Sequence, residues 1–279
     1  MTNSYIREKI SKNRIPRPFL KWVGGKTQIL HTLLDTIPRF GGTYHEPFLG
    51  GGALFFQLRP DKAVISDLNE ELINCYEMVR DDPEGLINLL SEYIYDKKFY
   101  YDMRQKNPLE MSGLHRAARM IYLNKTGFNG LYRVNSKGIF NVPFGRYRNP
   151  LICDEANLRG CAVALKTARI ECRSFESVLD VAQKGDLVYF DPPYIPLSKS
   201  AYFTAYEKGG FGMANQELLS RVFSELDQKG VFVILSNSDV PWIDDAYQPF
   251  NIRRIKALRM VNSDSSRRGK VGEVLVTNF

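Results

Sequence analysis

Cysteine and histidine are scarce in this chain, and neither forms a pattern that would hold a metal ion. Among 279 residues there are four cysteines and three histidines. The cysteines include no Cys-x-x-Cys pair, and the histidines (His31, His45 and His115) are far apart. Zinc sites need such ligands at short, regular spacings. We therefore expect no metal, and the scattered thiols predict a reducing, cytoplasmic setting.

Long apolar runs are also missing. Residues 1–14 are polar and basic without the apolar core of a signal peptide, and no later stretch is long enough to span a bilayer. There is no internal repeat and no low-complexity tract. With 44% hydrophobic residues, the composition is that of a globular protein with a sizeable core. We expect no membrane partner and a monomeric protein.

A phosphate-binding P-loop is excluded, although Gly25-Lys26-Thr27 matches the end of that motif. The motif needs a glycine five residues before Gly25, and position 20 is leucine. No β-rich run precedes it either. What remains is a glycine turn, with Trp22 beside it, that leads into a helix expected over residues 27–34.

Positive charge is concentrated in one part of the chain. The whole sequence carries a net charge of +7 and has a pI of about 9.1. Residues 97–148 contain eleven lysines and arginines but only two acids, Asp102 and Glu110. The remainder of the chain is therefore slightly acidic. A basic segment of this kind indicates a nucleic-acid partner.

The stretch Leu187-Val188-Tyr189-Phe190-Asp191-Pro192-Pro193-Tyr194 carries the clearest chemical signal. Its apolar half predicts a buried strand, and the two prolines end that strand at its carboxyl edge, where α/β sheets bind ligands. Asp191 and the carbonyl oxygen of Pro192 are hydrogen-bond acceptors, and Tyr194 offers a flat ring. Together they suit a nucleobase with an exocyclic amino group. The alternative is that Pro192-Pro193 only ends a strand.

A glycine-rich turn predicts a second site on the same edge. A short strand over residues 43–48 leads through Gly50-Gly51-Gly52 into a helix that begins near Ala53, and a strand over residues 63–67 ends at Asp67. An acid in that position commonly holds ribose hydroxyls. Phe55 interrupts the dinucleotide pattern, which disfavours a pyrophosphate and leaves S-adenosylmethionine (SAM) as the candidate. The alternative is a purely structural turn.

The segment of residues 125–147 interleaves basic side chains, amides and aromatic rings. Its Asn-Gly and Lys-Gly turns predict a protruding β-hairpin. Arginine can bind guanine and asparagine can bind adenine, while aromatic rings can stack on bases or wedge between them. The candidates for DNA contact here are Phe128, Asn129, Arg133, Lys137 and Arg146. The alternative is a solvated, charged hairpin.

Taken together, these motifs resemble the Dam-type DNA N6-adenine methyltransferases, over nearly the whole chain and in the order of that family. The matching stretches are residues 19–26, Glu46-Pro47-Phe48-Leu49-Gly50-Gly51-Gly52, Asp67-Leu68-Asn69, Leu123-Asn124-Lys125-Thr126-Gly127-Phe128-Asn129-Gly130-Leu131, residues 140–147 and Asp191-Pro192-Pro193-Tyr194. The resemblance implies an α/β fold with a Rossmann-like SAM-dependent methyltransferase sheet. An inserted, mainly helical target-recognition domain bearing the β-hairpin would cover residues 71–153, and residues 1–70 and 154–279 would form the catalytic domain.

The resemblance also implies roles for single residues. The side chains and turns around SAM would be Trp22, Lys26, Phe48, Gly50, Gly52, Asp67, Ser174, Phe175 and the neighbouring Asp191. Asp191 and the Pro192 carbonyl would bind the adenine amino group, with Tyr194 stacked on the base. The positions that read bases in double-stranded DNA, within a site that is usually GATC, would be Lys21, Asn129, Leu131, Arg133 and Pro143. Lys125 and Thr126 depart from the Arg-Tyr pair expected there.

Two other functions use parts of the same pattern. An RNA adenine methyltransferase can carry the same Asp-Pro-Pro-Tyr turn, and a DNA-binding protein without catalysis can retain the fold. Cytosine C5 methylation is disfavoured because no Pro-Cys occurs, and a zinc deaminase because His-x-Glu and Pro-Cys-x-x-Cys are absent. The hairpin-bearing insertion favours a DNA adenine methyltransferase.

Overall fold

The structure is a computed structural model that describes residues 15–26, 29–195, 211–258 and 270–279. Contacts divide the chain into two compact units. The first unit comprises residues 1–27, 50–59 and 67–172, and the second comprises residues 28–49, 60–66 and 173–279. The predicted target-recognition domain, residues 71–153, falls inside the first unit; its boundaries remain a prediction.

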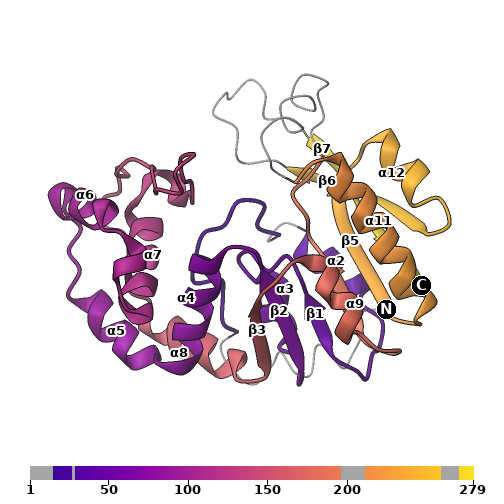
Figure 1. The fold of residues 1–279 in the computed structure, drawn as a ribbon, viewed down its shortest axis with the longest axis horizontal. Helices are drawn as coiled ribbons and strands as arrows, with labels where there is room; N and C mark the ends of the chain where they lie inside the picture. Colours follow the sequence, from indigo (N-terminus) through magenta and orange to yellow (C-terminus); the bar gives the residue numbers. More distant parts are fainter. Residues whose placement is uncertain (1–14, 27–28, 196–210, 259–269) are drawn as a thin grey trace. The chain divides into compact units, whose positions relative to one another are not determined.

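A seven-stranded mixed sheet confirms the predicted α/β class (Figure 1). The strand order is β3-β2-β1-β4-β5-β7-β6. β1 pairs in parallel with β2 and β4, and β4 pairs in parallel with β5, whereas β7 is antiparallel to β5 and β6. The strands are β1 (Tyr44–Glu46), β2 (Ala63–Asp67), β3 (Ala168–Cys172), β4 (Leu187–Phe190), β5 (Phe232–Ser238), β6 (Asn251–Leu258) and β7 (Lys270–Thr277).

The chain order of the strands reverses between β1 and β4, which makes this pair the topological switch point of the sheet. Tyr44 is in register with Leu187 and His45 with Val188. All four residues of β4 are buried, as expected for an apolar strand covered on both faces. Ligands of open α/β sheets bind beyond the carboxyl ends of strands at such a point. There, β4 leads directly into Asp191 and β1 leads into Phe48.

A buried contact between a histidine and an aspartate fixes the opposite ends of these strands. His45 Nε2 lies 3.0 Å from Asp186 Oδ2, and the two side chains are almost completely buried. The other carboxylate oxygen of Asp186 accepts a hydrogen bond of 2.7 Å from the backbone amide of Thr43. These contacts link the beginning of β1 to the residue that precedes β4, and so they fix the register of the two strands.

The core of the second unit lies between β4, β5, β7 and the helices that cover them. α11 (Met213–Gln228) packs against β5 and contacts α9 (Val178–Val181) and the 3₁₀ turn η3 (Phe175–Ser177). α2 (Leu30–Thr36) and α12 (Pro241–Ala246) complete this unit. The sequence predicted α11 and a helix near α2, whereas α9, η3 and α12 are too short to show a clear helical period.

Helices dominate the first unit. α4 packs against α5, α7, α8 and strand β3, and α7 also contacts α5 and α6. The sequence Asp82-Pro83 predicts a break between two helices, and this is confirmed, since one helix ends at Asp81 and the next begins at Pro83. The helices are α3 (Ala53–Leu58), α4 (Glu70–Asp81), α5 (Pro83–Ser91), α6 (Lys97–Gln105), α7 (Gly113–Thr126) and α8 (Glu155–Leu165), with 3₁₀ turns η1 (Pro108–Glu110) and η2 (Phe128–Gly130).

Side-chain caps explain where these helices begin. In each case a cap side chain accepts a hydrogen bond from the backbone amide three residues later, an interaction that stabilises a helix by about 1 kcal/mol. The caps are Asn69 for α4, Asp82 for α5, Asp96 for α6, Ser112 for α7 and Asp154 for α8.

In the part of the chain that the structure describes, no helix is both long and apolar enough to cross a membrane. The same residues contain no cluster of histidine, cysteine, aspartate or glutamate that could hold a metal ion.

Candidate active site

The turn after β4 is held rigidly by residues from β5 and α11. Pro192 is buried and Pro193 is exposed. Gln216 Nε2 of α11 donates a hydrogen bond of 2.9 Å to the carbonyl oxygen of Pro193. No donor among the described residues reaches the carbonyl oxygen of Pro192. The first of the two proline carbonyls can therefore accept a hydrogen bond from a ligand, while the second is already engaged.

The end of β5 supplies further contacts to this turn. Ser236 Oγ donates a hydrogen bond of 2.9 Å to Asp191 Oδ1. Asn237 Oδ1 accepts a hydrogen bond of 3.2 Å from the Ile195 amide, and Ser238 Oγ donates one of 2.8 Å to the Ile195 carbonyl. The apolar run of residues 231–235 predicts a buried strand that ends at Leu235. It continues to Ser238 because the turn satisfies the buried polar side chains that follow.

Tyr194 lies near Asp191 and is half-buried. Its hydroxyl donates a hydrogen bond of 3.3 Å to Glu273 Oε2 on β7. Burial, followed by the charges of Asp191 and Glu273, raises the pKa of Tyr194 far above its ordinary value. The ring therefore stays neutral at physiological pH. A neutral phenol ring with its hydroxyl anchored is suited to stacking on a planar ligand.

Two more tyrosines and a glutamate lie close to the Asp191 carboxylate. Tyr44 Oη donates a hydrogen bond of 2.8 Å to Glu46 Oε2, and both side chains are buried. Tyr189 Oη lies 3.0 Å from Ser236 Oγ. Burial raises the pKa of Tyr44 and Tyr189, and the negative charges of Glu46 and Asp191 raise it further. These phenols therefore remain proton donors.

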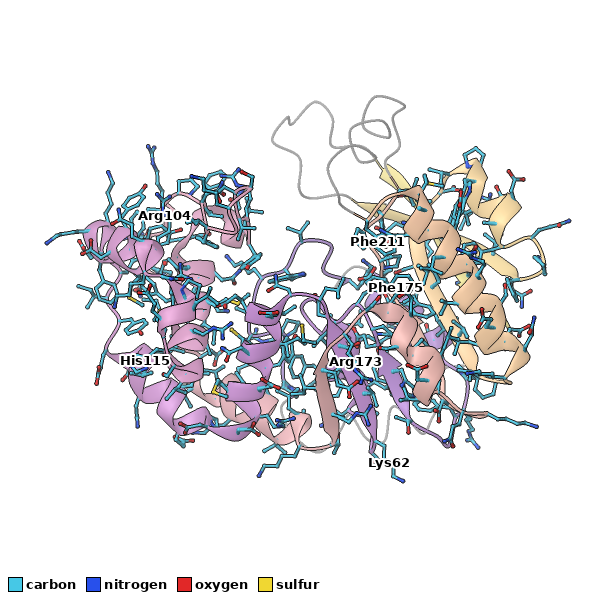
Figure 2. All side chains as sticks on the ribbon, in the orientation of Figure 1. Lys62, Arg104, His115, Arg173, Phe175 and Phe211 are labelled. Carbon is cyan, nitrogen blue, oxygen red and sulfur yellow. The ribbon has the colours of Figure 1, made fainter. Side chains whose placement is uncertain are left out.

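Four phenylalanines form an aromatic cluster in the second unit. Phe48 stacks on Phe175 with ring centroids 5.3 Å apart, and it meets Phe190 and Phe211 edge-on. Phe175 and Phe211 lie side by side, with centroids 5.8 Å apart (Figure 2). Ser174 precedes Phe175 and hydrogen-bonds Glu176. The fold thus brings together three residues of the predicted cofactor site, and adds Phe211, which no sequence motif marked.

In the first unit, the glycine turn and Asp67 are joined directly. The Gly50 amide donates a hydrogen bond of 3.0 Å to Asp67 Oδ2, and the Asn69 amide donates one of 3.0 Å to Asp67 Oδ1. Gly50 and Gly52 have φ angles of +49° and +63°, which favour glycine. Burial raises the pKa of Asp67, although the backbone hydrogen bonds act in the opposite direction.

Trp22 closes over the glycine turn. A β-carbon added to Gly50 would lie 2.8 Å from Trp22 Cδ1, so only glycine fits beneath the indole. Lys26 is buried, and its ammonium group donates a hydrogen bond of 2.7 Å to the Gly24 carbonyl. The indole also stacks on Tyr132, a residue of the basic segment. The predicted cofactor residues Trp22, Gly50 and Asp67 therefore lie together in this unit.

Residues 125–147 form an irregular antiparallel loop, which differs from the predicted hairpin. Isolated β-bridges join Gly127 to Phe144 and Val134 to Phe140, and no regular strand forms within this segment. Asn129 has a φ angle of +54°, at the point where the 3₁₀ turn η2 kinks. This left-handed residue and the three glycines between positions 127 and 138 interrupt the ladder, so a hairpin of regular strands is not formed.

Polar contacts hold the predicted base-reading residues. Asn124 binds both the amide and the carbonyl group of Lys21 and the carbonyl group of Gly130. The ammonium group of Lys21 lies 5.0 Å from the centre of the Tyr147 ring. Arg133 Nε and Nη2 donate hydrogen bonds of 2.7 and 3.1 Å to Asn141. The other predicted DNA-contacting residues differ in exposure. Leu131 is half-buried, and the exposed ones are Phe128, Asn129, Lys137, Pro143 and Arg146.

The two positions that depart from the family pattern face inward. Thr126 is fully buried, and its hydroxyl donates to the Tyr122 carbonyl. Lys125 is half-buried, and burial, followed by the positive charge of Lys21, lowers its pKa. Both residues support the segment from behind and do not belong to its exposed surface.

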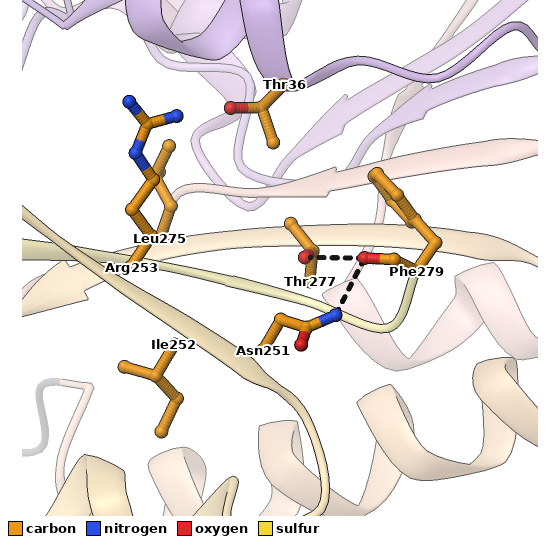
Figure 3. A pocket seen from close by; sticks show the side chains of 7 residues that line it. All are labelled: Thr36, Asn251, Ile252, Arg253, Leu275, Thr277 and Phe279. Atoms are coloured by element: carbon orange, nitrogen blue, oxygen red, sulfur yellow. Dashed lines mark hydrogen bonds between the residues drawn. The ribbon is translucent and has the colours of Figure 1, made fainter.

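A pocket of about 360 Å³ lies beside β6, β7 and the chain end at Phe279 (Figure 3). Thr277 Oγ1 and Asn251 Nδ2 both donate to the carbonyl oxygen of Phe279. The lining residues are Thr36, Asn251, Ile252, Arg253, Leu275, Thr277 and Phe279, and none of them is a predicted site residue.

Comparison with known proteins identifies the class of enzyme to which this fold and site belong. Residues 22–261 match the family model of the D12 class N6 adenine-specific DNA methyltransferases. The chain belongs to this family of adenine-specific DNA methyltransferases.

Several curated relatives have nearly the same length. A type II methyltransferase of Lactococcus lactis, M1.LlaDCHI, is 48% identical over 97% of this chain and 98% of its own. M.MjaIII, a type II methyltransferase of Methanocaldococcus jannaschii, is 42% identical over 94% of this chain and 99% of its own. The DNA adenine methylase of Escherichia coli is 34% identical over 93% of this chain and 94% of its own.

Proposed function

We propose that this protein transfers a methyl group from SAM to the N6 atom of an adenine in double-stranded DNA, within the sequence GATC. One observation carries the chemistry. Asp191 and the Pro192 carbonyl follow each other at the carboxyl end of β4, and Tyr194 lies beside them. Two acceptors and a neutral ring at a switch point match the amino group and the face of adenine.

The amino group of adenine is a weak nucleophile because its lone pair is delocalised into the ring. Two acceptors on its hydrogens favour a pyramidal nitrogen whose lone pair points away from them. Asp191 and the Pro192 carbonyl would supply these hydrogen bonds, and Tyr194 would stack on the base. Most of the acceleration then comes from positioning and electrostatics, so no covalent nucleophile is needed.

The residues of the first unit fit an adenosine-containing methyl donor. Asp67 already accepts one backbone hydrogen bond on each oxygen, and each oxygen has a further lone pair for a ribose hydroxyl. Gly50 allows a ligand to approach the backbone closely. SAM supplies an electrophilic methyl group when bound. We propose that Trp22, Lys26, Gly50, Gly52 and Asp67 bind it. The resemblance adds Phe48, Ser174, Phe175 and Asp191 to the proposed cofactor residues.

The basic segment would select the target site. An adenine in a duplex must leave the base stack before its N6 atom can react, which costs a few kcal/mol. Arg133 and Asn129 have the side-chain types that read guanine and adenine in the major groove. Lys21, Leu131 and Pro143 complete the set proposed to contact bases, while Lys137 and Arg146 would contact phosphates. Exposed Phe128 has the shape to occupy the space left by the flipped base.

The proposal is tested by incubating the purified protein with SAM and unmethylated plasmid, followed by sequencing that maps N6-methyladenine. We expect one modified adenine in each GATC and none elsewhere. A different single motif would retain the chemistry but refute GATC. A parallel reaction with RNA of the same sequence tests the RNA alternative. Absence of methylation in both, with SAM bound, would point to a DNA-binding protein without catalysis. We further propose a monomer that acts on DNA in the bacterial cytoplasm.

A further inference from the structure

Two buried hydroxyl groups connect strands β4 and β5 to the Asp191 carboxylate. Tyr189 Oη lies 3.0 Å from Ser236 Oγ, and Ser236 Oγ lies 2.9 Å from Asp191 Oδ1. Tyr189 and Ser236 are 1% and 0% exposed. Solvent therefore does not reach the contact between the two hydroxyl groups, and the Ser236 hydroxyl approaches the half-buried Asp191 from the protein interior.

The direction of this hydrogen-bond chain follows from the number of protons. An ionised carboxylate only accepts hydrogen bonds, so Ser236 must use its single proton on Asp191. The hydroxyl of Tyr189 is then the donor to Ser236. Burial, together with the negative charge of Asp191, raises the pKa of Tyr189, so it retains that proton. The chain runs in one direction, from Tyr189 through Ser236 to Asp191.

We propose that Ser236, oriented by Tyr189, is a positioning residue that fixes the Asp191 carboxylate for the adenine amino group. The proposal rests on the function proposed above. A carboxylate can rotate about its bond to Cβ, and a hydrogen bond from the neighbouring strand selects one orientation. Asp191 is then preorganised to accept a hydrogen bond from the N6 amino group.

The surroundings of Asp191 give Ser236 a second effect. Among the residues that the structure describes, the groups that face Asp191 include Tyr44 on β1, Tyr189 on β4 and Tyr194 in the turn, with the carboxylates of Glu46 and Glu273 bonded to two of these phenols. A hydrogen bond donated to a carboxylate favours its ionised form. The hydrogen bond from Ser236 therefore favours the ionised form of Asp191.

The test compares S236A, Y189F and the double variant S236A/Y189F. S236A leaves the buried Tyr189 hydroxyl without an acceptor, which destabilises the fold. The double variant removes both hydroxyls and so avoids this problem, while it still lacks the contact to Asp191. S236T restores a hydroxyl at the same position. S238A is the matched control, because Ser238 is a buried serine of the same strand whose hydroxyl binds the Ile195 carbonyl.

The measurement is the single-turnover rate of methyl transfer to a GATC duplex as a function of pH, with thermal melting and SAM affinity recorded for each variant. We expect S236A and the double variant to lose about ten-fold in rate, with unchanged SAM affinity. The acid limb of their pH profiles should move to higher pH by about one unit. Y189F should show a smaller shift in the same direction, S236T should restore the wild-type limb, and S238A should leave it in place.

Each outcome decides a different question. A double variant with wild-type melting, a rate within two-fold of wild type and an unmoved acid limb would overturn the positioning role of Ser236. The proposal would also be overturned if S238A lost as much rate as S236A and the acid limb of S236A did not move. Ser236 would then have only a structural role. A wild-type protein that methylates neither this duplex nor any other adenine would instead refute the proposed function.

Discussion

The indole ring of Trp22 stacks on the phenol ring of Tyr132, with 5.2 Å between ring centroids and 24° between their planes. Trp22 also covers Gly50, and Tyr132 stands between Leu131 and Arg133. One aromatic pair therefore links the glycine turn of the proposed cofactor site to the segment proposed to read DNA.

Replacing Tyr132 by leucine removes the stack, and a stacked aromatic pair contributes about 0.5–1.5 kcal/mol. We expect SAM to bind about three- to ten-fold more weakly to Y132L, because Trp22 loses its support. The quenching of Trp22 fluorescence by SAM measures this in a W242F background, since Trp22 and Trp242 are the two tryptophans. Y132F retains the ring and should bind SAM as the wild type does; equal affinity of Y132L would refute the coupling.

Gly50 should tolerate no side chain. An alanine there would place its β-carbon 2.8 Å from Trp22 Cδ1 at a φ angle of +49°, a conformation that costs an L-residue about 1 kcal/mol or more. We expect G50A to weaken SAM binding at least ten-fold, measured by isothermal titration calorimetry. Exposed Gly41 has nothing within 4 Å of the corresponding position, so G41A is the matched control and should behave as wild type.

Asp191 should be indispensable for methyl transfer. We expect D191A to lower the single-turnover rate at least a hundred-fold, since the amino group loses one of its two acceptors. SAM affinity should fall far less than the rate, because Asp191 is one of nine residues proposed to surround SAM, and the melting temperature should change little, because the side chain is only half-buried. D245A removes an exposed acid on α12 and serves as the control. Near-normal methyl-transfer activity of D191A would refute the assignment of this turn as catalytic.

As the pH is lowered, SAM binding should begin to weaken at a higher pH than it would if Asp67 were exposed to solvent. Burial raises the pKa of Asp67, and the protonated acid loses acceptor capacity for ribose hydroxyls. The dissociation constant for SAM should therefore rise as the pH falls through this raised pKa. The stability of the protein without SAM should change in the opposite direction. The folded state binds the proton on Asp67 more tightly than the unfolded state does, so this group contributes more to the free energy of unfolding as the pH falls. D67N should bind SAM weakly and show neither pH dependence.

Arg133 should act on specificity, in contrast to Lys137. Two of its guanidinium nitrogens are held by Asn141, which fixes the orientation of the exposed fork. We expect R133A to lower discrimination against single-base variants of the site about ten-fold, with a smaller effect on binding to unrelated DNA. K137A should weaken binding to all sequences alike and reduce its salt dependence. Methylation rates on duplexes with one altered base pair provide the measurement. An unchanged preference in R133A would remove it from base reading.

Sequence patterns predicted helices and strands well wherever a clear hydrophobic pattern or a strong boundary residue was present. β2 begins and ends at the predicted residues, and the break between α4 and α5 falls at Asp82-Pro83. The predicted end of β5 at Leu235 was wrong, and the predicted hairpin around Asn129 contains isolated antiparallel bridges in place of regular strands. In both cases the outcome depends on contacts distant in the sequence, such as those between Ser236 and Asp191 and between Asn124 and Lys21.

The supporting residues of the site carried no local signal. Ser236, Tyr189 and Gln216 are ordinary residues in the sequence, and they acquire a role only because β4, β5 and α11 pack together. Phe211 similarly joins Phe48 and Phe175 from a different part of the chain. Comparing the polar residues at the ends of neighbouring predicted strands would have pointed to Ser236, since such ends meet at one edge of a parallel sheet.

The sequence by itself determined the chemistry available at the Asp191-Pro192-Pro193-Tyr194 turn. Residue types fix which groups can accept a proton, stack or bend the chain, and proline ends a strand wherever it occurs. Only the tertiary structure decided how that chemistry is held. The Gln216 side chain donates a hydrogen bond to the Pro193 carbonyl, and Ser236 donates one to Asp191. Hydrogen bonds of this kind depend on positions within a few tenths of an ångström, and packing sets those positions.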